Sequence, residues 1–281
     1  MTLVSEQAML FPPDPAPALP SPDERILVGT SGYSFRDWVG PFYPEGMRAS
    51  RYLDFYIRQF PALELNVSHY RVPDAPMLAR NAGRTPPGFH FTVKLHKSMT
   101  HDRVLDDVEP FRAALEPLRQ AGKLDGLLAQ FPYAFRRDAA AERHLEVLRE
   151  RFPESPLFAE FRHDSWLGTD LADWLRERRI GYVVVDEPRL QHLLPPVPLV
   201  TAEDAYVRFH GRNSEMWWDG GHRRYDYAYS EQELSEWVTK IAELAQQARR
   251  TYLFFNNCHA GHAARSAKLM QDLLRQQKLS A

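Results

Sequence analysis

Polar side chains that can transfer protons or bind anions recur near the ends of apolar runs in this sequence. Glu64 lies in "ALELNV", Lys94 in "FHFTVKL" and Glu160 near the end of "PLFAEF". Two carboxyl groups whose pKa values differ can serve as general acid and general base. Lysine binds an anion as a point charge, and arginine adds bidentate geometry for a carboxylate or phosphate. A lysine on a barrel strand can also form a Schiff base when desolvation lowers its pKa, but anion binding is the role expected of Lys94. These residue types predict acid–base chemistry on an anionic small molecule.

The candidate site residues divide by the chemistry of their side chains. Proton transfer is expected of three residues, Glu64, Glu160 and His210, the last because histidine titrates near neutral pH. Substrate binding is expected of side chains that carry positive charge, form hydrogen bonds or offer a ring, namely Asn66, Lys94, Gln130, Arg162, Arg208, Asn256 and Trp38. The expected substrate is phosphorylated or carboxylated and includes sugar-like molecules. The expected reaction is an isomerisation, an epimerisation or a hydrolysis.

Eight short runs rich in β-branched and aromatic residues predict the strands that position these side chains. Amphipathic helical patterns separate most of the runs, an alternation that favours an α/β fold, a TIM (β/α)8 barrel. The predicted strands cover residues 26–30, 62–67, 89–95, 126–131, 156–161, 182–186, 205–210 and 251–257. An open doubly wound sheet is the weaker alternative, because "GTSGYS" after the first run lacks the G-x-G-x-x-G spacing.

The barrel predicts where the polar side chains meet. Active sites of such barrels lie at the carboxyl ends of the strands, and residues two apart on a strand share a face, as Arg208 and His210 do. We therefore expect the candidate residues to share one pocket. The alternative is an inert network in which Glu160 pairs with Arg208 and Glu64 pairs with Lys94.

Local signals set some of the helix boundaries. Ser230 and Glu233 have the spacing of a capping box, which predicts that a helix begins there. Thr169 is expected to be the N-cap of an earlier helix. The proline-rich segment 187–204 is expected to hold no regular helix.

Two segments that follow predicted strands are long and aromatic. Residues 31–46 read "SGYSFRDWVGPFYPEG", and residues 211–229 read "GRNSEMWWDGGHRRYDYAY". Exposed aromatic side chains beside glycine suit a lid or a stacking platform for a sugar or a base. The alternative is that these rings fill the barrel mouth as part of the core.

Composition limits the classes of partner. The chain has 35 Lys and Arg against 37 Asp and Glu, for a net charge of -2, so no global field favours nucleic acid or a membrane. Residues 1–24 lack a secretory signal pattern and are expected to form a disordered, proline-rich tail, with a single barrel domain over residues 25–281. The single cysteine, Cys258, fits a reducing compartment, and we expect a cytoplasmic protein. The sequence gives no indication of the oligomeric state.

Metal and nucleic-acid chemistry are the alternatives to a small anionic substrate. No cofactor is predicted, but a divalent metal in a hydrolase would have candidate ligands in Glu64, Glu160, Asp186 and His210. Nearby Lys and Arg side chains would repel such a cation, and the "CHAGH" stretch of residues 258–262 lacks a fourth ligand for zinc. The arginine-rich and aromatic stretch 211–229 could bind single-stranded nucleic acid, although the near-neutral net charge argues against it.

Seven stretches, taken in order, resemble the YecE-like family, also called the domain of unknown function 72. They are "GTSGYSFRDWVGPFYP", "LELNVSHYRVP", "FTVKLHKSMTH", "LLAQFPYAF", "AEFRHDSW", "YVRFHGR" and "FFNNCHAGHA". The resemblance implies a TIM-barrel-like fold and carries no established activity. It also adds Tyr70 to the expected substrate-binding residues. The chain departs from the family at Ser68 and His69, commonly Thr and Phe, and at Ser266, commonly Asn.

Overall fold

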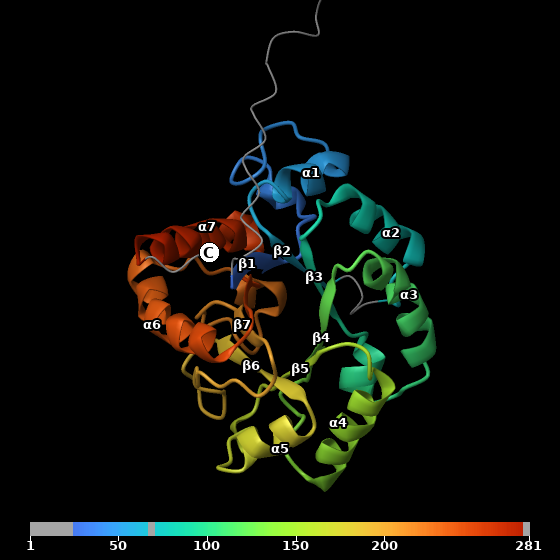
Figure 1. Cartoon of the computed structure of the whole chain (residues 1–281). Helices are drawn as coiled ribbons and strands as arrows, with labels where there is room; N and C mark the ends of the chain where they lie inside the picture. The colour runs from blue at the N-terminus through green and yellow to red at the C-terminus, as the bar shows by residue number, and fades with distance from the viewer. Residues whose placement is uncertain (1–24, 67–70, 278–281) are drawn as a thin grey trace, which may run out of the picture.

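Eight parallel strands close into a barrel in which each strand pairs with its neighbours in the sequence (Figure 1). The computed structural model describes residues 25–66 and 71–277, so the predicted tail over residues 1–24 lies outside the described residues. The strands are β1 (Ile26–Ser31), β2 (Ala62–Leu65), β3 (His90–Lys94), β4 (Leu124–Gln130), β5 (Leu157–Glu160), β6 (Ile180–Asp186), β7 (Ala205–Phe209) and β8 (Thr251–Phe255). The predicted barrel is confirmed, because β1 also pairs with β8.

Helices surround the barrel and connect most of its strands (Figure 1). The α-helices are α1 (Tyr52–Tyr56), α2 (Ala75–Arg84), α3 (Val108–Gln120), α4 (Ala139–Arg151), α5 (Leu171–Glu177), α6 (Glu231–Gln247) and α7 (His262–Gln276). Single turns lie at η1 (Arg36–Trp38), η2 (Ala49–Arg51), η4 (Ser98–Asp102), η5 (Asp164–Trp166), η6 (Gly221–Tyr225) and η7 (His259–Gly261). Residues 187–204, all of them described, connect β6 to β7 without a regular helix, as predicted.

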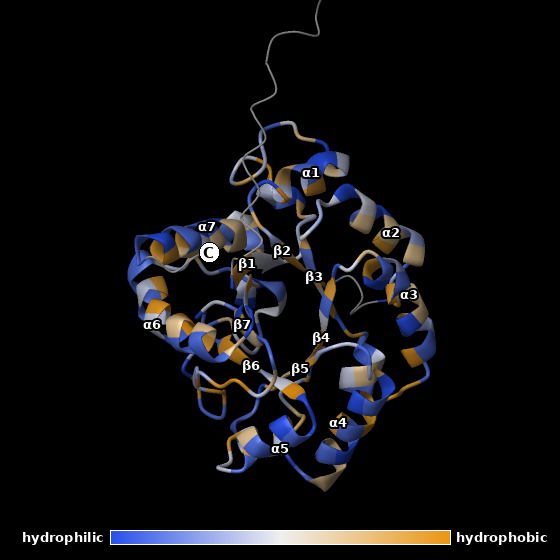
Figure 2. Cartoon of the chain, viewed as in Figure 1, coloured by the Kyte–Doolittle hydropathy of each residue, from blue (hydrophilic) through white to orange (hydrophobic). Residues whose placement is uncertain are grey.

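The outward faces of the strands pack against the helices. Phe209 of β7 lies 5.0 Å, between ring centroids, from Trp237 of α6 and 4.4 Å from Phe255 of β8. In Figure 2, α4, α6 and α7 each carry both hydrophobic and hydrophilic residues along their length, as helices on a core must. Burial of these apolar faces is the main driving force that holds the ring of helices to the barrel.

Aromatic side chains fill the part of the barrel interior that is nearer the amino ends of the strands. The ring of Tyr206 lies 4.9 Å from Phe158 and 5.2 Å from Phe254, measured between centroids. Tyr252 packs beside them, 6.0 Å from Tyr206. This layer leaves the space toward the carboxyl ends of the strands for polar side chains.

The helix starts agree only in part with the local signals. The capping box before α6 is confirmed, because Ser230 Oγ accepts a hydrogen bond from the Glu233 amide and the Glu233 side chain accepts one from the Ser230 amide. The prediction for Thr169 is wrong, since Asp170 precedes α5 and makes no side-chain capping bond. In the described ranges, the helices are all too short or too polar to cross a bilayer.

Candidate functional site

Strand register brings polar residues to one level of the barrel. Ser31 of β1 lies beside Glu64 of β2, and Glu64 lies beside Thr92 of β3. On the other side of the barrel, Gln130 of β4 lies beside Glu160 of β5. Because the strands are parallel and side chains alternate, these residues point into the barrel just before the strands end. The layer they form lies between the aromatic layer and the barrel mouth.

Arg208 on β7 forms the centre of this layer, with only 1% of its surface exposed. Its Nε and Nη2 atoms donate to the two carboxylate oxygens of Glu64 at 2.9 and 2.7 Å. Its Nη1 atom donates to Glu160 Oε2 at 2.6 Å. Tyr206 also donates to Glu64, at 2.6 Å. One arginine therefore joins the carboxylates of β2 and β5 across the barrel: the predicted pair of Glu160 with Arg208 is observed, and the carboxylate of Glu64 is held by the same arginine.

Arg162 continues the network toward the mouth. Its Nε atom donates to Glu160 Oε1 at 2.6 Å and its Nη1 atom to Glu187 Oε2 at 3.0 Å. His210 Nε2 lies 3.2 Å from Glu160 Oε1, and His210 Nδ1 lies 3.1 Å from Asn256 Nδ2. With the amide in this orientation, Nδ1 accepts from Asn256, while Nε2 lies between Glu160 Oε1, an acceptor, and Arg162 Nη2, a donor at 3.1 Å. Glu160 thus receives hydrogen bonds on both oxygens.

Burial and charge set the protonation states in the network. Burial alone would raise the pKa of Glu160, but the positive charges of Arg162 and Arg208 outweigh it and hold this pKa well below the ordinary value. Burial, reinforced by Arg162, lowers the pKa of His210 to about 3. At neutral pH, Glu160 is therefore a carboxylate and His210 is a neutral imidazole.

Lys94 at the end of β3 lies in different surroundings. Its Nζ atom donates to Gln130 Oε1 at 2.8 Å, and the amide nitrogen of Gln130 donates in turn to the Phe131 carbonyl. Burial, followed by the positive charge of Arg208, lowers the pKa of Lys94 to about 7. A substantial fraction of this lysine is therefore a neutral amine near neutral pH.

A cavity of about 420 Å³ opens above the network. Lys94, Gln130 and Arg162 lie on its polar side. Aromatic walls come from the segment 211–229, in Trp217, Trp218 and Tyr225. The guanidinium carbon of Arg162 lies 5.7 Å from the ring centroid of Trp217, within reach of a cation–π interaction. The cavity thus combines cationic groups with ring surfaces.

The aromatic residues of segment 31–46 are arranged differently. Trp38 is fully buried, and its ring lies 4.9 Å from Phe35 and 5.5 Å from Phe42. Its indole nitrogen donates to the Cys258 carbonyl at 2.7 Å. Trp38 joins the loops that follow β1 and β8, and it is not among the residues that line the cavity. The core alternative therefore describes Trp38 better than the stacking alternative does.

The structure separates the remaining candidates. Asn66 Oδ1 is buried and has no hydrogen-bond partner among the described residues. Tyr70 lies outside the described residues. Asp186 pairs in register with the outward-facing Phe209, and both its oxygens accept from Arg212 Nε, at 3.1 and 3.0 Å. The expectation that Asp186 converges with Glu64, Glu160 and His210 is wrong, because its side chain has the opposite parity.

Glu187 is the residue that the sequence analysis missed. It follows Asp186, points inward and is fully buried, where Arg162 Nη1 and the Leu194 amide donate to its two oxygens. Burial raises the pKa of Glu187 to about 7 despite the charge of Arg162. Strand parity could have identified it, since residues 183, 185 and 187 share one face.

A possible metal ligand set lies at the edge of the barrel mouth. Ligand atoms of Asp226, His259 and His262 lie within 4.8 Å of one another. Arg265 Nη2 lies 2.7 Å from His262 Nδ1, so a positive charge already occupies the far side of this imidazole. The thiol of Cys258 is directed elsewhere, with Sγ 3.2 Å from the Ser31 carbonyl oxygen. The charge of Arg265 beside His262 disfavours a bound cation. Because Cys258 points elsewhere, the three side chains of "CHAGH" that could bind zinc do not converge.

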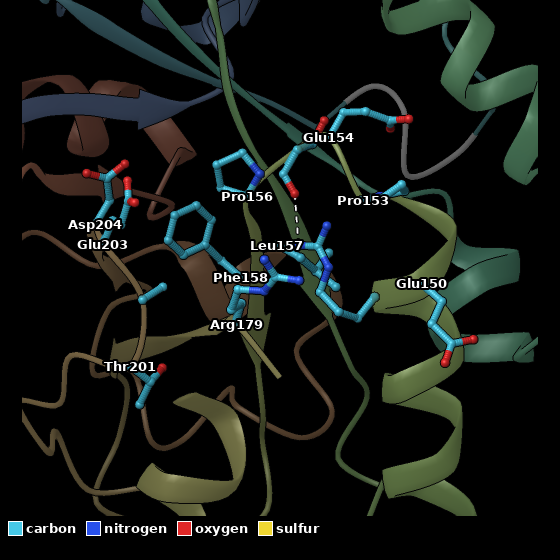
Figure 3. Close-up of a pocket in the computed structure, with 13 residues that line it drawn as sticks. Glu150, Pro153, Glu154, Pro156, Leu157, Phe158, Arg179, Thr201, Glu203 and Asp204 are labelled. Atoms are coloured by element: carbon cyan, nitrogen blue, oxygen red, sulfur yellow. Dashed lines mark hydrogen bonds between the residues drawn. The ribbon is translucent and has the colours of Figure 1, made fainter. Parts of the chain in front are cut away.

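A larger cavity, of about 640 Å³, lies at the opposite end of the barrel (Figure 3). Pro156 and Leu157 at the start of β5, Arg179 before β6 and Asp204 before β7 line it. Barrel enzymes carry their catalytic groups at the carboxyl ends of the strands, and none of the candidate residues that the structure describes lies here. The candidate site is therefore the smaller cavity above Arg208.

Comparisons with known proteins agree with this architecture. A family model described as "Protein of unknown function DUF72" matches residues 27–281. The "UPF0759 protein YunF" of Bacillus subtilis (strain 168) is 30% identical over 269 residues, which are 89% of this chain and 94% of that protein. The crystal structure of a DUF72 family protein from Thermotoga maritima MSB8 superposes with a TM-score of 0.84 and 41% identity, covering 90% of this chain and 100% of that chain. A second, from Enterococcus faecalis V583, gives a TM-score of 0.79 and 25% identity, covering 89% and 95%. The chain therefore belongs to the DUF72 family, and the resemblance seen in its motifs is confirmed.

Proposed function

We propose that this chain is an enzyme that uses acid–base chemistry on an anionic small molecule bound in the cavity at the barrel mouth. The observation that carries the proposal is the lining of that cavity, where Lys94 and Arg162 lie together with the rings of Trp217 and Tyr225. Cationic groups with fixed positions bind a phosphate or carboxylate, and rings pack against the apolar face of a sugar or another cyclic substrate.

The buried network suggests how the roles divide. Lys94 is the proton-transfer group, because its pKa of about 7 allows it to give or take a proton at neutral pH. Arg162 binds the anion, with Gln130 as a hydrogen-bonding group beside it. Glu64 and Glu160 were expected to transfer protons, but both are fully buried and hydrogen-bonded to Arg208. We assign them, together with His210 and Asn256, to the positioning of the two arginines.

Single-stranded nucleic acid is the second candidate ligand, since its bases could stack on the exposed aromatic side chain at the cavity. Trp218 is 48% exposed, and Arg224 lies near it in the cavity lining. Stacking and phosphate contacts from one segment suit single-stranded nucleic acid. The cavity walls support the small-molecule proposal more directly, because Lys94 and Arg162 lie at the cavity floor rather than along a groove.

A thermal-shift experiment tests the proposal with two neighbouring arginines as a matched pair. Arg224 lines the cavity, whereas Arg223 beside it in η6 is exposed and is not among the lining residues. Melting temperatures are measured with inorganic phosphate, sugar phosphates, small carboxylates and a short oligonucleotide. We expect one class of anion to raise the melting temperature, since binding to the folded state stabilises it.

The variants show whether the cavity is responsible. Arg224→Gln should lower the affinity for the anion about tenfold, which is the effect of losing one charge-assisted hydrogen bond. Arg223→Gln should show the same thermal shift as the wild type. A stabilising anion is then incubated with the enzyme and followed by NMR, where conversion that is lost in Lys94→Met supports the catalytic role. Equal responses of the two arginine variants, or no response to any anion, would overturn the proposal. A shift with the oligonucleotide alone would favour the second candidate.

A further inference from the structure

The deepest polar group in the cavity is an amine rather than a carboxylate. Lys94 is 9% exposed, and its Nζ atom donates to the neutral amide oxygen of Gln130 at 2.8 Å. The two buried carboxylates of the layer, Glu64 and Glu160, are both held by Arg208, with bonds of 2.6 to 2.9 Å. Arg208 and Arg162 thus place positive charge beside the carboxylates nearest to Lys94.

We propose that Lys94 forms an imine with a small aldehyde or ketone that carries a carboxylate or phosphate group. This inference rests on the proposed function for the place where the ligand binds, and it names the substrate class of that site. The cavity offers both parts of the recognition. Its volume of about 420 Å³ holds a small substrate above the amine, and Arg162 and Arg224 lie in its lining to bind the anionic group.

The charge of the layer supports a nucleophilic amine. Among the groups that face Lys94, the carboxylates of Glu64 and Glu160 are matched by the guanidinium groups of Arg208 and Arg162. An ammonium at Lys94 would add a further buried positive charge, whereas a neutral amine adds none. Desolvation beside other cations is the recognised way in which a lysine becomes a nucleophile in water-excluded sites.

A second buried lysine provides the contrast. Lys123 is 8% exposed, yet its ammonium donates to the Ala82 carbonyl, the Thr85 carbonyl and the Thr85 hydroxyl at 2.6, 2.6 and 3.0 Å. Burial lowers the pKa of Lys123 as well, but three oxygen acceptors satisfy all three protons of its ammonium. Lys123 is therefore a structural lysine, and it serves as the matched control for Lys94.

The step balances without an oxidant or a reductant. The lone pair of the neutral Nζ atom attacks the carbonyl carbon, a C–N bond forms, and the carbonyl π electrons move to oxygen. A proton passes from nitrogen to that oxygen through solvent to give the carbinolamine. The hydroxyl group leaves as water when it is protonated, and the C=N bond forms. This loss of water gives the iminium directly, and the imine forms when its nitrogen gives up a proton to solvent; the iminium charge lies where the ammonium charge would, near the carboxylates of Glu64 and Glu160.

Chemical trapping tests the imine directly. The full chain is incubated with pyruvate or with dihydroxyacetone phosphate, reduced with sodium cyanoborohydride and analysed by peptide mass mapping. We expect an irreversible adduct on Lys94 at least tenfold more abundant than on the exposed Lys268. The two substrates distinguish a 2-oxo acid from a phosphorylated ketone. Labelling that is equal on Lys94 and on exposed lysines would overturn the proposal.

Two variants distinguish the failure of imine formation from the failure of anion binding in the cavity. Lys94→Arg cannot form an imine, so it should lose the adduct, whereas an anion bound by Arg162 and Arg224 should still raise its melting temperature. Lys123→Arg should still form the adduct on Lys94. If the wild type shows the thermal shift but no adduct, the imine is wrong and the proposed function stands. If neither the shift nor the adduct is observed, both are wrong.

The pH dependence of trapping provides a further readout. With the pKa of Lys94 lowered to about 7 from 10.5, the adduct should form at a rate that rises through pH 7 and then levels. In residues 25–66 and 71–277, the charged or titratable groups that act on this amine include Arg208, Glu160, Glu64 and Arg162, with His101 close by. His101 has its own pKa lowered to about 4 by burial, so it is neutral throughout this range. A rate that still rises steeply above pH 9 would indicate an ordinary lysine and would contradict the proposal.

Discussion

Arg208 and Glu64 form a bidentate ion pair inside the barrel, with Nε to Oε2 at 2.9 Å and Nη2 to Oε1 at 2.7 Å. The exposed fractions of the two side chains are 1% and 0%. Removing both charges from water costs several kcal/mol per ion, and only complete hydrogen bonding offsets that cost. The pair is therefore sensitive to loss of either partner, and the sensitivity extends to Glu160 through the same guanidinium.

Arg208→Met should strongly destabilise the fold. It leaves Glu64 and Glu160 buried without their shared cation, a loss that typically costs about 3–5 kcal/mol. The free energy of unfolding from urea titration measures the change. Arg275→Ala is the control, because Arg275 pairs with Asp272 at the surface with exposed fractions of 57% and 61%, and it should change stability by less than about 1 kcal/mol. Similar effects of the two substitutions would show that the network contributes nothing specific.

The sequence was sufficient for the barrel because each strand is a short apolar run of the kind that packs on both faces. All eight runs match observed strands to within a few residues; "AYVRFH" at 205–210, for example, became β7, Ala205–Phe209. It was also sufficient to bring Glu64, Glu160 and Arg208 to one layer, since alternation and strand order fix their level. The partners of each charge could not be predicted, because a choice among neighbouring arginines depends on distances that only packing sets.

The strand end at 186 and 187 shows the limit most clearly. Asp186 ends the apolar run, but parity places Glu187 in the barrel and Asp186 outside, beside Arg212. A one-residue difference in the end of the strand changes which carboxyl group faces the site. Trp38 shows a second limit, because the sequence alone does not distinguish an aromatic wall from a buried ring.

Close contact between β1 and β2 predicts a second sensitive position. A Cβ atom on Gly29 would lie 2.2 Å from the carbonyl oxygen of Ala62, its register partner. Because that oxygen belongs to the backbone of the barrel, Gly29→Ala should destabilise by about 1–3 kcal/mol. Gly83 in α2 has open space around it, so Gly83→Ala should stabilise by about 0.4–1 kcal/mol. Urea titration of both variants measures the contrast, and equal effects would contradict it.

His210 predicts a stability that rises with pH. Its folded-state pKa is lowered to about 3 from 6.5, so between these values the unfolded chain binds a proton that the folded chain does not. One such proton changes the free energy of unfolding by at most about 1.4 kcal/mol per pH unit. His210→Gln should therefore lose less stability than the wild type when the pH falls from 6.5 toward 4.5, the other histidines being common to both. Parallel pH curves for the two proteins would show that His210 is not buried as a neutral imidazole.

The titration of Glu187 should lower the stability of the fold as the pH rises through the same range. Its folded-state pKa is raised to about 7 from 4.5, so between these values the folded chain holds a proton that the unfolded chain has released. Stability from this group is complete below pH 4.5 and is lost as the pH rises toward 7. In the wild type the two titrations change the free energy of unfolding in opposite directions. A variant that removes one of them should therefore show the pH dependence caused by the other.

Glu187→Gln keeps an acceptor for Arg162 Nη1 and removes the titration. Its stability should rise more steeply with pH than that of the wild type, whereas the stability of His210→Gln should rise less steeply or fall. Urea titrations at several pH values between 4.5 and 7 measure both slopes, and they span the interval between the two pKa values of Glu187. Slopes that change in the same direction in the two variants would mean that Arg162 keeps Glu187 ionised.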